Sequence, residues 1–97
     1  MQAISIAATG VAITTSATSA GNTIPNNAAG RVPQVIRIAS TQAAYVRIGT
    51  GAQTAVSTDM MVYPGDAVLL ETCGSTHIAA LQVTTAGIVQ VSPVEGI

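Results

Sequence analysis

Charged side chains are scarce in this 97-residue chain, which has three arginines, four acidic residues and no lysine. Soluble domains commonly have about a quarter of their residues charged, whereas the fraction here is 7%. The net charge of -1 gives no basic surface that could hold nucleic-acid phosphates. We therefore expect protein partners and no nucleic acid.

Aromatic residues are almost absent too, with no Phe, no Trp and two Tyr. A hydrophobic content of 48% nevertheless argues against disorder. The length supports one domain, residues 1–97, whose small core must be built from Ile, Val, Leu and Ala. Because such a core is thin, we expect association with other chains to add stability.

Single copies of cysteine and histidine limit the possible chemistry. Cys73 has no partner for an intrachain disulfide, and we expect it to be a buried small hydrophobic residue. His77 has no carboxylate at ligand spacing, so it predicts a hydrogen-bonded or surface residue at a strand end. No nucleophile–base pair, phosphate loop or carboxylate pair is recognisable, and Asp59 and Asp66 suit local capping and a turn. We expect no enzyme activity, no metal and no cofactor.

The hydropathy pattern predicts neither export nor membrane insertion. The first residues lack the basic and apolar regions of a signal peptide. No apolar run reaches the roughly 18 residues of a membrane span. The expectation is a protein made in the cytoplasm, with no membrane partner.

Short runs rich in Val, Ile and Thr, separated by turn residues, predict an all-β chain with about eight strands. No helical periodicity extends over ten residues. Eight short strands fit either a partly closed barrel or two packed antiparallel sheets, and of these two architectures we expect the β-sandwich. The predicted strands are Ala3–Ala8, Val11–Thr15, Gln34–Ala39, Ala44–Ile48, Met60–Tyr63, Ala67–Thr72, His77–Thr84 and Gly87–Val91.

Alternation in two of these strands suggests an outward-facing polar surface. If strands 34–39 and 44–48 pair as a hairpin, Arg37, Tyr45 and Arg47 share one outer face, as a solvated surface or as a contact patch. The last two strands are likewise expected to form a hairpin. Tyr63-Pro64-Gly65-Asp66 is typical of a type II turn.

Residues 16–33 form a long polar stretch after the second predicted strand. Connections of this length without secondary structure are uncommon in compact domains and are often functional or mobile. The stretch has no acidic residue, and its only charge is Arg31. It supplies the remaining candidate partner-contact residues: Asn22, Ile24, Asn26, Asn27 and Arg31.

Five short segments between residues 24 and 95 resemble small virion proteins of tailed bacteriophages, in particular head decoration (cement) proteins. The segments are Ile24–Asn27 through Arg31–Pro33, Val35–Ala39, Ala44–Gly49, Tyr63–Asp66 and His77–Ala79. The resemblance implies a jelly-roll-like sandwich on the capsid surface that binds the major capsid protein and forms a homo-oligomer, with a trimer favoured. It implies no catalytic residues.

Two other hypotheses remain open. The chain could be a head, neck or spike component that acts as a ligand- or receptor-binding β module, although only Tyr45 and Tyr63 could stack on a sugar. The Pro-Gly-Asp turn could also indicate a degenerate cupin-like enzyme. One histidine and scattered carboxylates are too few ligands for such a metal centre.

Overall fold

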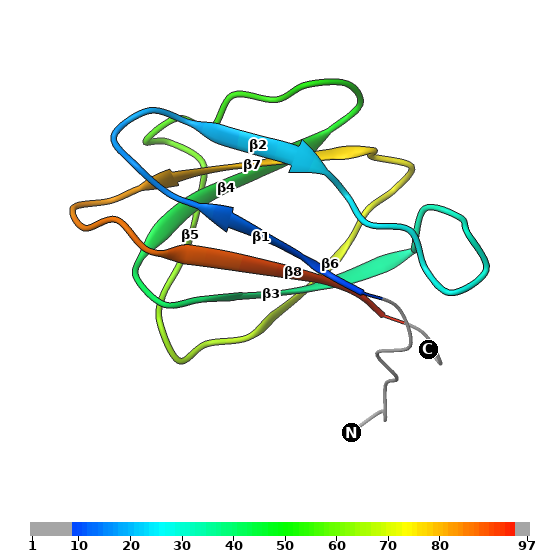
Figure 1. The fold of residues 1–97 in the computed structure, drawn as a ribbon. Helices are drawn as coiled ribbons and strands as arrows, with labels where there is room; N and C mark the ends of the chain where they lie inside the picture. The colour runs from blue at the N-terminus through cyan, green and yellow to red at the C-terminus, as the bar shows by residue number, and fades with distance from the viewer. Residues whose placement is uncertain (1–8, 95–97) are drawn as a thin grey trace.

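A computed structural model describes residues 9–94, which form two four-stranded antiparallel sheets packed face to face (Figure 1). No helix occurs in this range. The predicted all-β sandwich is therefore confirmed, while the predicted strand Ala3–Ala8 lies outside the described residues. The eight strands are β1 (Val11–Thr14), β2 (Ala20–Thr23), β3 (Val35–Ser40), β4 (Ala44–Gly49), β5 (Met60–Val62), β6 (Val68–Glu71), β7 (His77–Gln82) and β8 (Ile88–Val94).

The strand order is that of a jelly roll. One sheet has the order β1-β8-β3-β6 and the other β2-β7-β4-β5. Four antiparallel pairs join strands that are progressively closer in the sequence: β1 with β8, β2 with β7, β3 with β6 and β4 with β5. The chain thus follows a long hairpin wrapped across two sheets, the arrangement of eight-stranded jelly rolls.

The core lies between the sheets and is entirely aliphatic in the described residues. Alternate residues of the central strands point inward, as the period of two requires. Each such side chain removed from water stabilises the fold by about 1.5–3 kcal/mol. The buried cluster consists of Ile13, Ile24, Ile36, Ile38, Ala44, Val46, Val62, Ile78, Ala80, Val89 and Val91.

Two predicted hairpins are wrong. β3 and β4 belong to different sheets, and so do β7 and β8. In this topology every pair of consecutive strands changes sheet except β4 and β5. The three-residue connection 41–43 therefore crosses from one layer to the other instead of reversing within a sheet.

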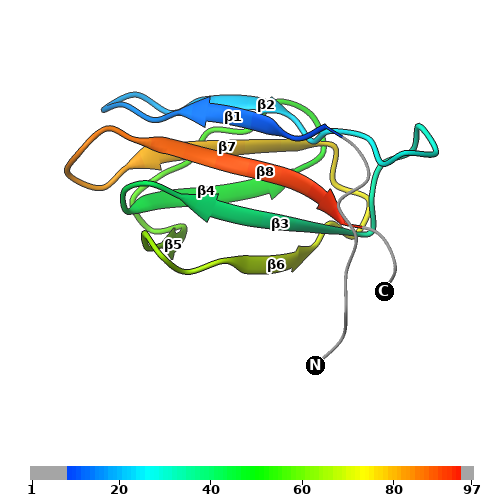
Figure 2. The same ribbon diagram turned by 60° about the horizontal axis from the view of Figure 1, so that its bottom comes forward.

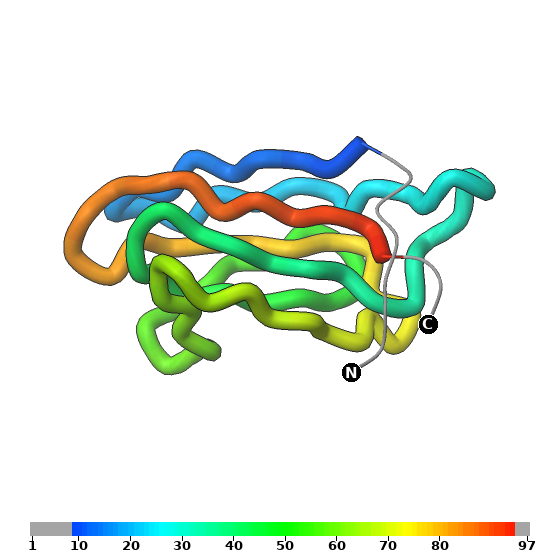
Figure 3. The backbone as a smooth tube through the Cα atoms, turned by 90° about the horizontal axis from the view of Figure 1, so that it is seen from below, coloured from blue at the N-terminus to red at the C-terminus, as the bar shows by residue number. Residues whose placement is uncertain are grey.

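The interpretation of residues 16–33 as one long loop needs correction, because β2 lies inside it. The sequence of β2, Ala-Gly-Asn-Thr, lacks the β-branched apolar residues that identify strands. Its backbone pairs with β7 along all four residues, so tertiary pairing forms the strand despite weak local propensity. The remaining loop, residues 24–34, projects beyond the strand ends (cyan in Figure 3).

Of the local predictions, the Tyr63–Asp66 turn is confirmed and the burial of Cys73 is wrong. Asp66 N–H donates to the Tyr63 carbonyl at 3.2 Å, and Gly65 has φ of 88°. Cys73 is exposed, with φ of 50°, in the turn that Ser75 N–H closes onto Thr72. A central turn position points the thiol to solvent.

His77 begins β7, and its Nδ1 lies 2.8 Å from the Thr76 hydroxyl oxygen. The predicted hydrogen-bonded position at a strand end is therefore confirmed.

Candidate interaction surface

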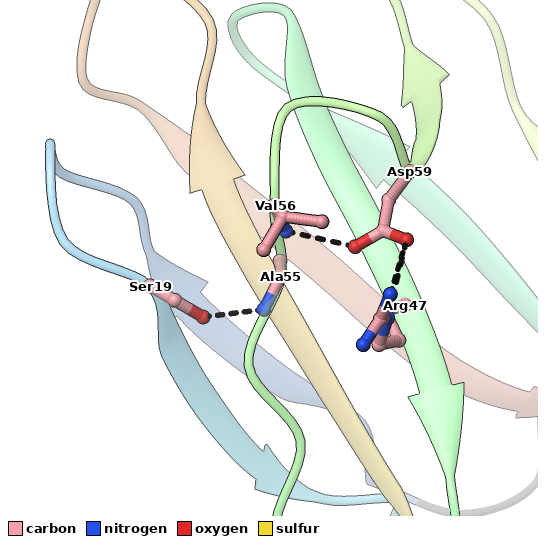
Figure 4. A network of polar contacts seen from close by, with 5 residues as sticks. All are labelled: Ser19, Arg47, Ala55, Val56 and Asp59. Carbon is pink, nitrogen blue, oxygen red and sulfur yellow. Dashed lines mark hydrogen bonds and ion pairs between the residues drawn. The ribbon is translucent and has the colours of Figure 1, made fainter.

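The outer face of the β2-β7-β4-β5 sheet is covered by the chain itself. Ala79 alternates with the inward-facing Ile78 and Ala80, so its side chain points outward, yet it is completely buried. The loop 50–59 between β4 and β5 crosses β7 on this face, where Gln53 of the loop lies next to Gly21, the neighbour of Ala79. The loop is attached by a 2.8 Å hydrogen bond from Ala55 N–H to the Ser19 hydroxyl (Figure 4). This face is therefore closed to a large partner near β7.

An ion pair between Arg47 of β4 and Asp59 fixes the C-terminal end of the same loop (Figure 4). Asp59 accepts hydrogen bonds from Val56 N–H at 2.8 Å and from Arg47 Nε at 3.1 Å. The Val56 N–H and, to a smaller extent, the Arg47 guanidinium lower the pKa of the Asp59 carboxyl. The carboxylate thus confirms the predicted local capping role immediately before β5.

Among residues 9–94, no loop covers the outer face of the other sheet in this way. Its strands point apolar and scattered polar side chains outward, and only Arg37 and Glu71 carry charge among them. By alternation with the buried residues of each strand, this face consists of Ala12, Thr14, Val35, Arg37, Ala39, Leu69, Glu71, Ile88, Gln90 and Ser92. Arg37 and Leu69 are direct cross-strand neighbours.

The two lateral sides of the sandwich differ (Figure 2). At one side the edge strands β1 and β2 contact each other across the two layers. At the opposite side lie the edge strands β5 and β6, joined by the Tyr63–Asp66 turn. These two strands and their turn carry three of the six exposed large apolar side chains of the described residues: Met60 is exposed by 42%, Tyr63 by 54% and Leu69 by 51%. We call Met60, Tyr63, Leu69 and the outer edges of β5 and β6 the β5–β6 side.

Within residues 9–94, the outer edge of β6 also presents backbone groups that pair with no other strand. Thr72 N–H donates to the Gln34 carbonyl of the neighbouring chain segment, in register with the β3–β6 ladder. Because the bonding direction alternates along an antiparallel strand, Leu70 and Val68 also face β3. The N–H and C=O groups of Leu69 and Glu71 therefore point away from the sheet.

A surface cleft of about 550 Å³ lies where β6 ends and the 24–34 loop returns to β3. Glu71 and Cys73 line it together with Val32 and Val35. One carboxylate and one thiol are too few to bind a metal ion, and residues 9–94 contain no cluster of three metal-binding side chains. The cleft offers shape without recognisable catalytic chemistry.

The structure divides the predicted contact residues of the 16–33 stretch between core, strand and loop. Ile24 is 1% exposed and belongs to the core. Asn22 is an exposed residue of β2, and Asn26 and Arg31 are exposed in the loop. Asn27 has a structural role, because its Oδ1 accepts hydrogen bonds from the backbone N–H groups of Ala29 and Arg31.

The three predicted contact residues of the sheet surface do not share one face. Tyr45 and Arg47 lie together on the outer face of the β2-β7-β4-β5 sheet, where Arg47 pairs with Asp59 at 3.0 Å. Arg37 lies on the outer face of the opposite sheet. The predicted grouping depended on the incorrect β3–β4 hairpin.

The sequence did not indicate Met60 and Leu69 as contact residues, and it indicated Tyr63 only as a turn residue and for sugar stacking. A signal was present in the strand Val68-Leu69-Leu70, where an apolar residue interrupts the expected alternation. Its meaning depends on β6 being an edge strand, which is a property of the whole topology.

Comparisons with known proteins gave no match among family models, curated proteins or solved structures. Within residues 9–94, no helix has the length and hydropathy needed to cross a membrane.

Proposed function

We propose that this chain is a non-enzymatic structural protein of a bacteriophage virion that decorates the capsid by binding the major capsid protein and copies of itself. The observation that carries the proposal is the β5–β6 side. It combines three exposed large apolar side chains and a free strand edge in a chain with only seven charged residues. Such a surface favours stable association with protein over dispersal in solvent.

The topology supports the same proposal. Eight-stranded jelly rolls occur among viral capsid domains, lectins and cupins. The fold alone does not distinguish these classes, since unrelated functions share it. Against a cupin-type enzyme, His77 uses Nδ1 in a local contact with Thr76, and the described acidic side chains are scattered over loops and strand ends.

Association also fits the energetics of the core. The aliphatic core is thin, and binding to neighbours adds stability by mass action. Obligate interfaces are more apolar than transient ones, so a sparsely charged, Ala- and Thr-rich surface suits permanent attachment. The three-fold symmetry expected from the resemblance stays a prediction.

The test is the composition of virions from the source that encodes this chain. Density-purified particles are analysed by quantitative mass spectrometry, and particles lacking the chain are compared for head stability on heating. We expect copies in a fixed ratio to the capsid protein and heads that open at lower temperature without the chain. Absence from particles would contradict the proposal, and strong binding on a glycan array would favour the ligand-binding module.

A further inference from the structure

Among the described residues, the outer edge of β6 has few of the features that usually prevent strands from pairing with another chain. Natural edges are commonly protected by charged side chains, lysine above all, and by proline, bulges or a covering segment. The one charge of β6 is Glu71, at its end. β6 has the sequence Val-Leu-Leu-Glu, without lysine or proline, and it pairs with β3 in an unbroken four-residue register. Leu69, in its middle, is 51% exposed. An extended strand could therefore add to β6 through backbone hydrogen bonds.

The other sheet edges are less suitable for such pairing. β1 and β2 face each other across one side of the sandwich. β5 is only three residues long and leads directly into Tyr63 and Pro64, whose proline ring has no N–H to donate. β6 is therefore the edge best suited to pairing among the described strands.

We propose that two copies of this chain pair through β6, antiparallel about a two-fold axis at Leu69, so that the two β1-β8-β3-β6 sheets form one continuous sheet. The inference rests on the self-association in the proposed function, adds its surface and register, and favours a two-fold dimer over the trimer that the resemblance implies. With Leu69 opposite Leu69 of the second copy, Glu71 of each copy lies opposite Ala67 of the other. The backbone N–H and C=O groups of these residues also point toward the opposite strand. Each such pair exchanges two hydrogen bonds.

The side chains favour a second copy as the occupant. In this register Leu69 meets an identical apolar residue, which is a favourable cross-strand pair. Glu71 lies opposite Ala67 of the second copy, and the two Glu71 residues are about 13 Å apart along the strands. Beyond about a Debye length of 8–10 Å, their repulsion is largely screened at physiological salt. The strand is thus complementary to itself without burying a charge.

Substitution of the free N–H tests the pairing. Leu69→Pro removes the Leu69 backbone N–H, which bonds to no other strand within the described monomer, whereas Leu69→Ala keeps this N–H. The matched control is Ala12→Pro, on the edge strand β1. Thr15 N–H donates to the Gly87 carbonyl and so points toward β8. Because the bonding direction alternates along the strand, the Ala12 N–H points away from β8. Sedimentation equilibrium is expected to give a dimer for the wild type and Ala12→Pro, with the dissociation constant raised at least tenfold in Leu69→Pro.

A cross-linking pair tests the register independently and does not require proline to be tolerated. In a Cys73→Asn background, Leu69→Cys is expected to oxidise to a disulfide-linked dimer, because directly opposed residues have Cα atoms about 5.5 Å apart. Glu71→Cys is the control that should stay monomeric under denaturing conditions. Equal cross-linking of both variants, or of neither, would overturn the proposed register.

The outcomes separate this inference from the proposed function. A monomeric wild type, or an oligomer of any size that Leu69→Pro leaves intact, would overturn the β6 pairing. Neither result changes whether the chain is present in virions. Conversely, a β6-paired dimer that is absent from particles would contradict the proposed function and leave the pairing established.

Discussion

Arg47 of β4 and Asp59, twelve residues later, form a charged contact of 3.0 Å that ties the β4–β5 loop to the sheet beneath it. The same carboxylate accepts a hydrogen bond from Val56 N–H. Ala79 of β7, which this loop crosses, is completely buried. The contact therefore helps to keep one outer face closed while the β5–β6 side stays open.

This contact predicts a loss of stability in acid. The Val56 N–H and Arg47 lower the pKa of Asp59 below its usual value of 3.8 in the folded chain. A carboxyl whose folded pKa is lowered stabilises the fold above the unfolded pKa, and that contribution disappears as the pH falls through the folded pKa. Calorimetry from pH 6 to pH 2 should show a steeper fall in Tm below about pH 4 for the wild type than for Asp59→Asn. Parallel curves would contradict the role of Asp59.

A second prediction concerns the buried hydroxyl that joins β1 to the start of β8. Thr15 is 2% exposed, and its Oγ1 donates to the Gly87 carbonyl at 3.1 Å and accepts from Gly87 N–H at 2.8 Å. Thr15→Val keeps the shape of the side chain and leaves Gly87 without this side-chain partner. The free energy of unfolding, measured in urea, should fall by about 1–3 kcal/mol. Thr14→Val, at the exposed neighbouring position, is the control and should change stability little.

The aliphatic core predicts strong sensitivity to truncation. Ile36 is completely buried between the sheets, whereas Ile88 is 44% exposed. Ile36→Ala should lower the free energy of unfolding by about 2–5 kcal/mol, enough to unfold much of a marginal domain. Ile88→Ala makes the same chemical change at the surface and should stay within about 0.5 kcal/mol. Similar losses in both variants would contradict a core in which Ile36 is buried between the sheets and Ile88 lies outside it.

Cys73 offers a stabilising substitution. Its φ of 50° and the following Gly74 φ of 83° define a turn with two left-handed residues. Asn tolerates this conformation better than other side chains do, and Asn-Gly is the preferred pair in such turns. Cys73→Asn should raise the free energy of unfolding by roughly 0.5–1 kcal/mol, while Cys73→Ala should not. A gain with alanine instead would assign the effect to loss of the thiol.

The fold class was predictable because its signal is local. In β3 and β8, β-branched residues alternate with polar or small ones, and the period of two identifies strands and their inward faces. The Tyr63–Asp66 turn was predictable for the same reason, since Pro64 and Gly65 set the backbone angles directly.

The candidate surface was not predictable, because it depends on non-local pairing. β2 has weak strand propensity and forms through its register with β7. The hairpin error at β3 and β4 arose because a three-residue connection can either reverse within a sheet or cross between layers. The outward-pointing backbone groups of Leu69 are free because β6 lies at a sheet edge, and that place is fixed only when β3 lies between β6 and β8.

Whether association stabilises this chain is measured directly by the dependence of Tm on protein concentration, using calorimetry on the purified wild-type chain. Because association adds stability by mass action, we expect Tm to rise steadily as the concentration increases. The same samples should show an oligomeric mass by light scattering. A Tm that is high and independent of concentration, with a monomeric mass throughout, would contradict the central claim that this chain obtains its stability from neighbouring chains.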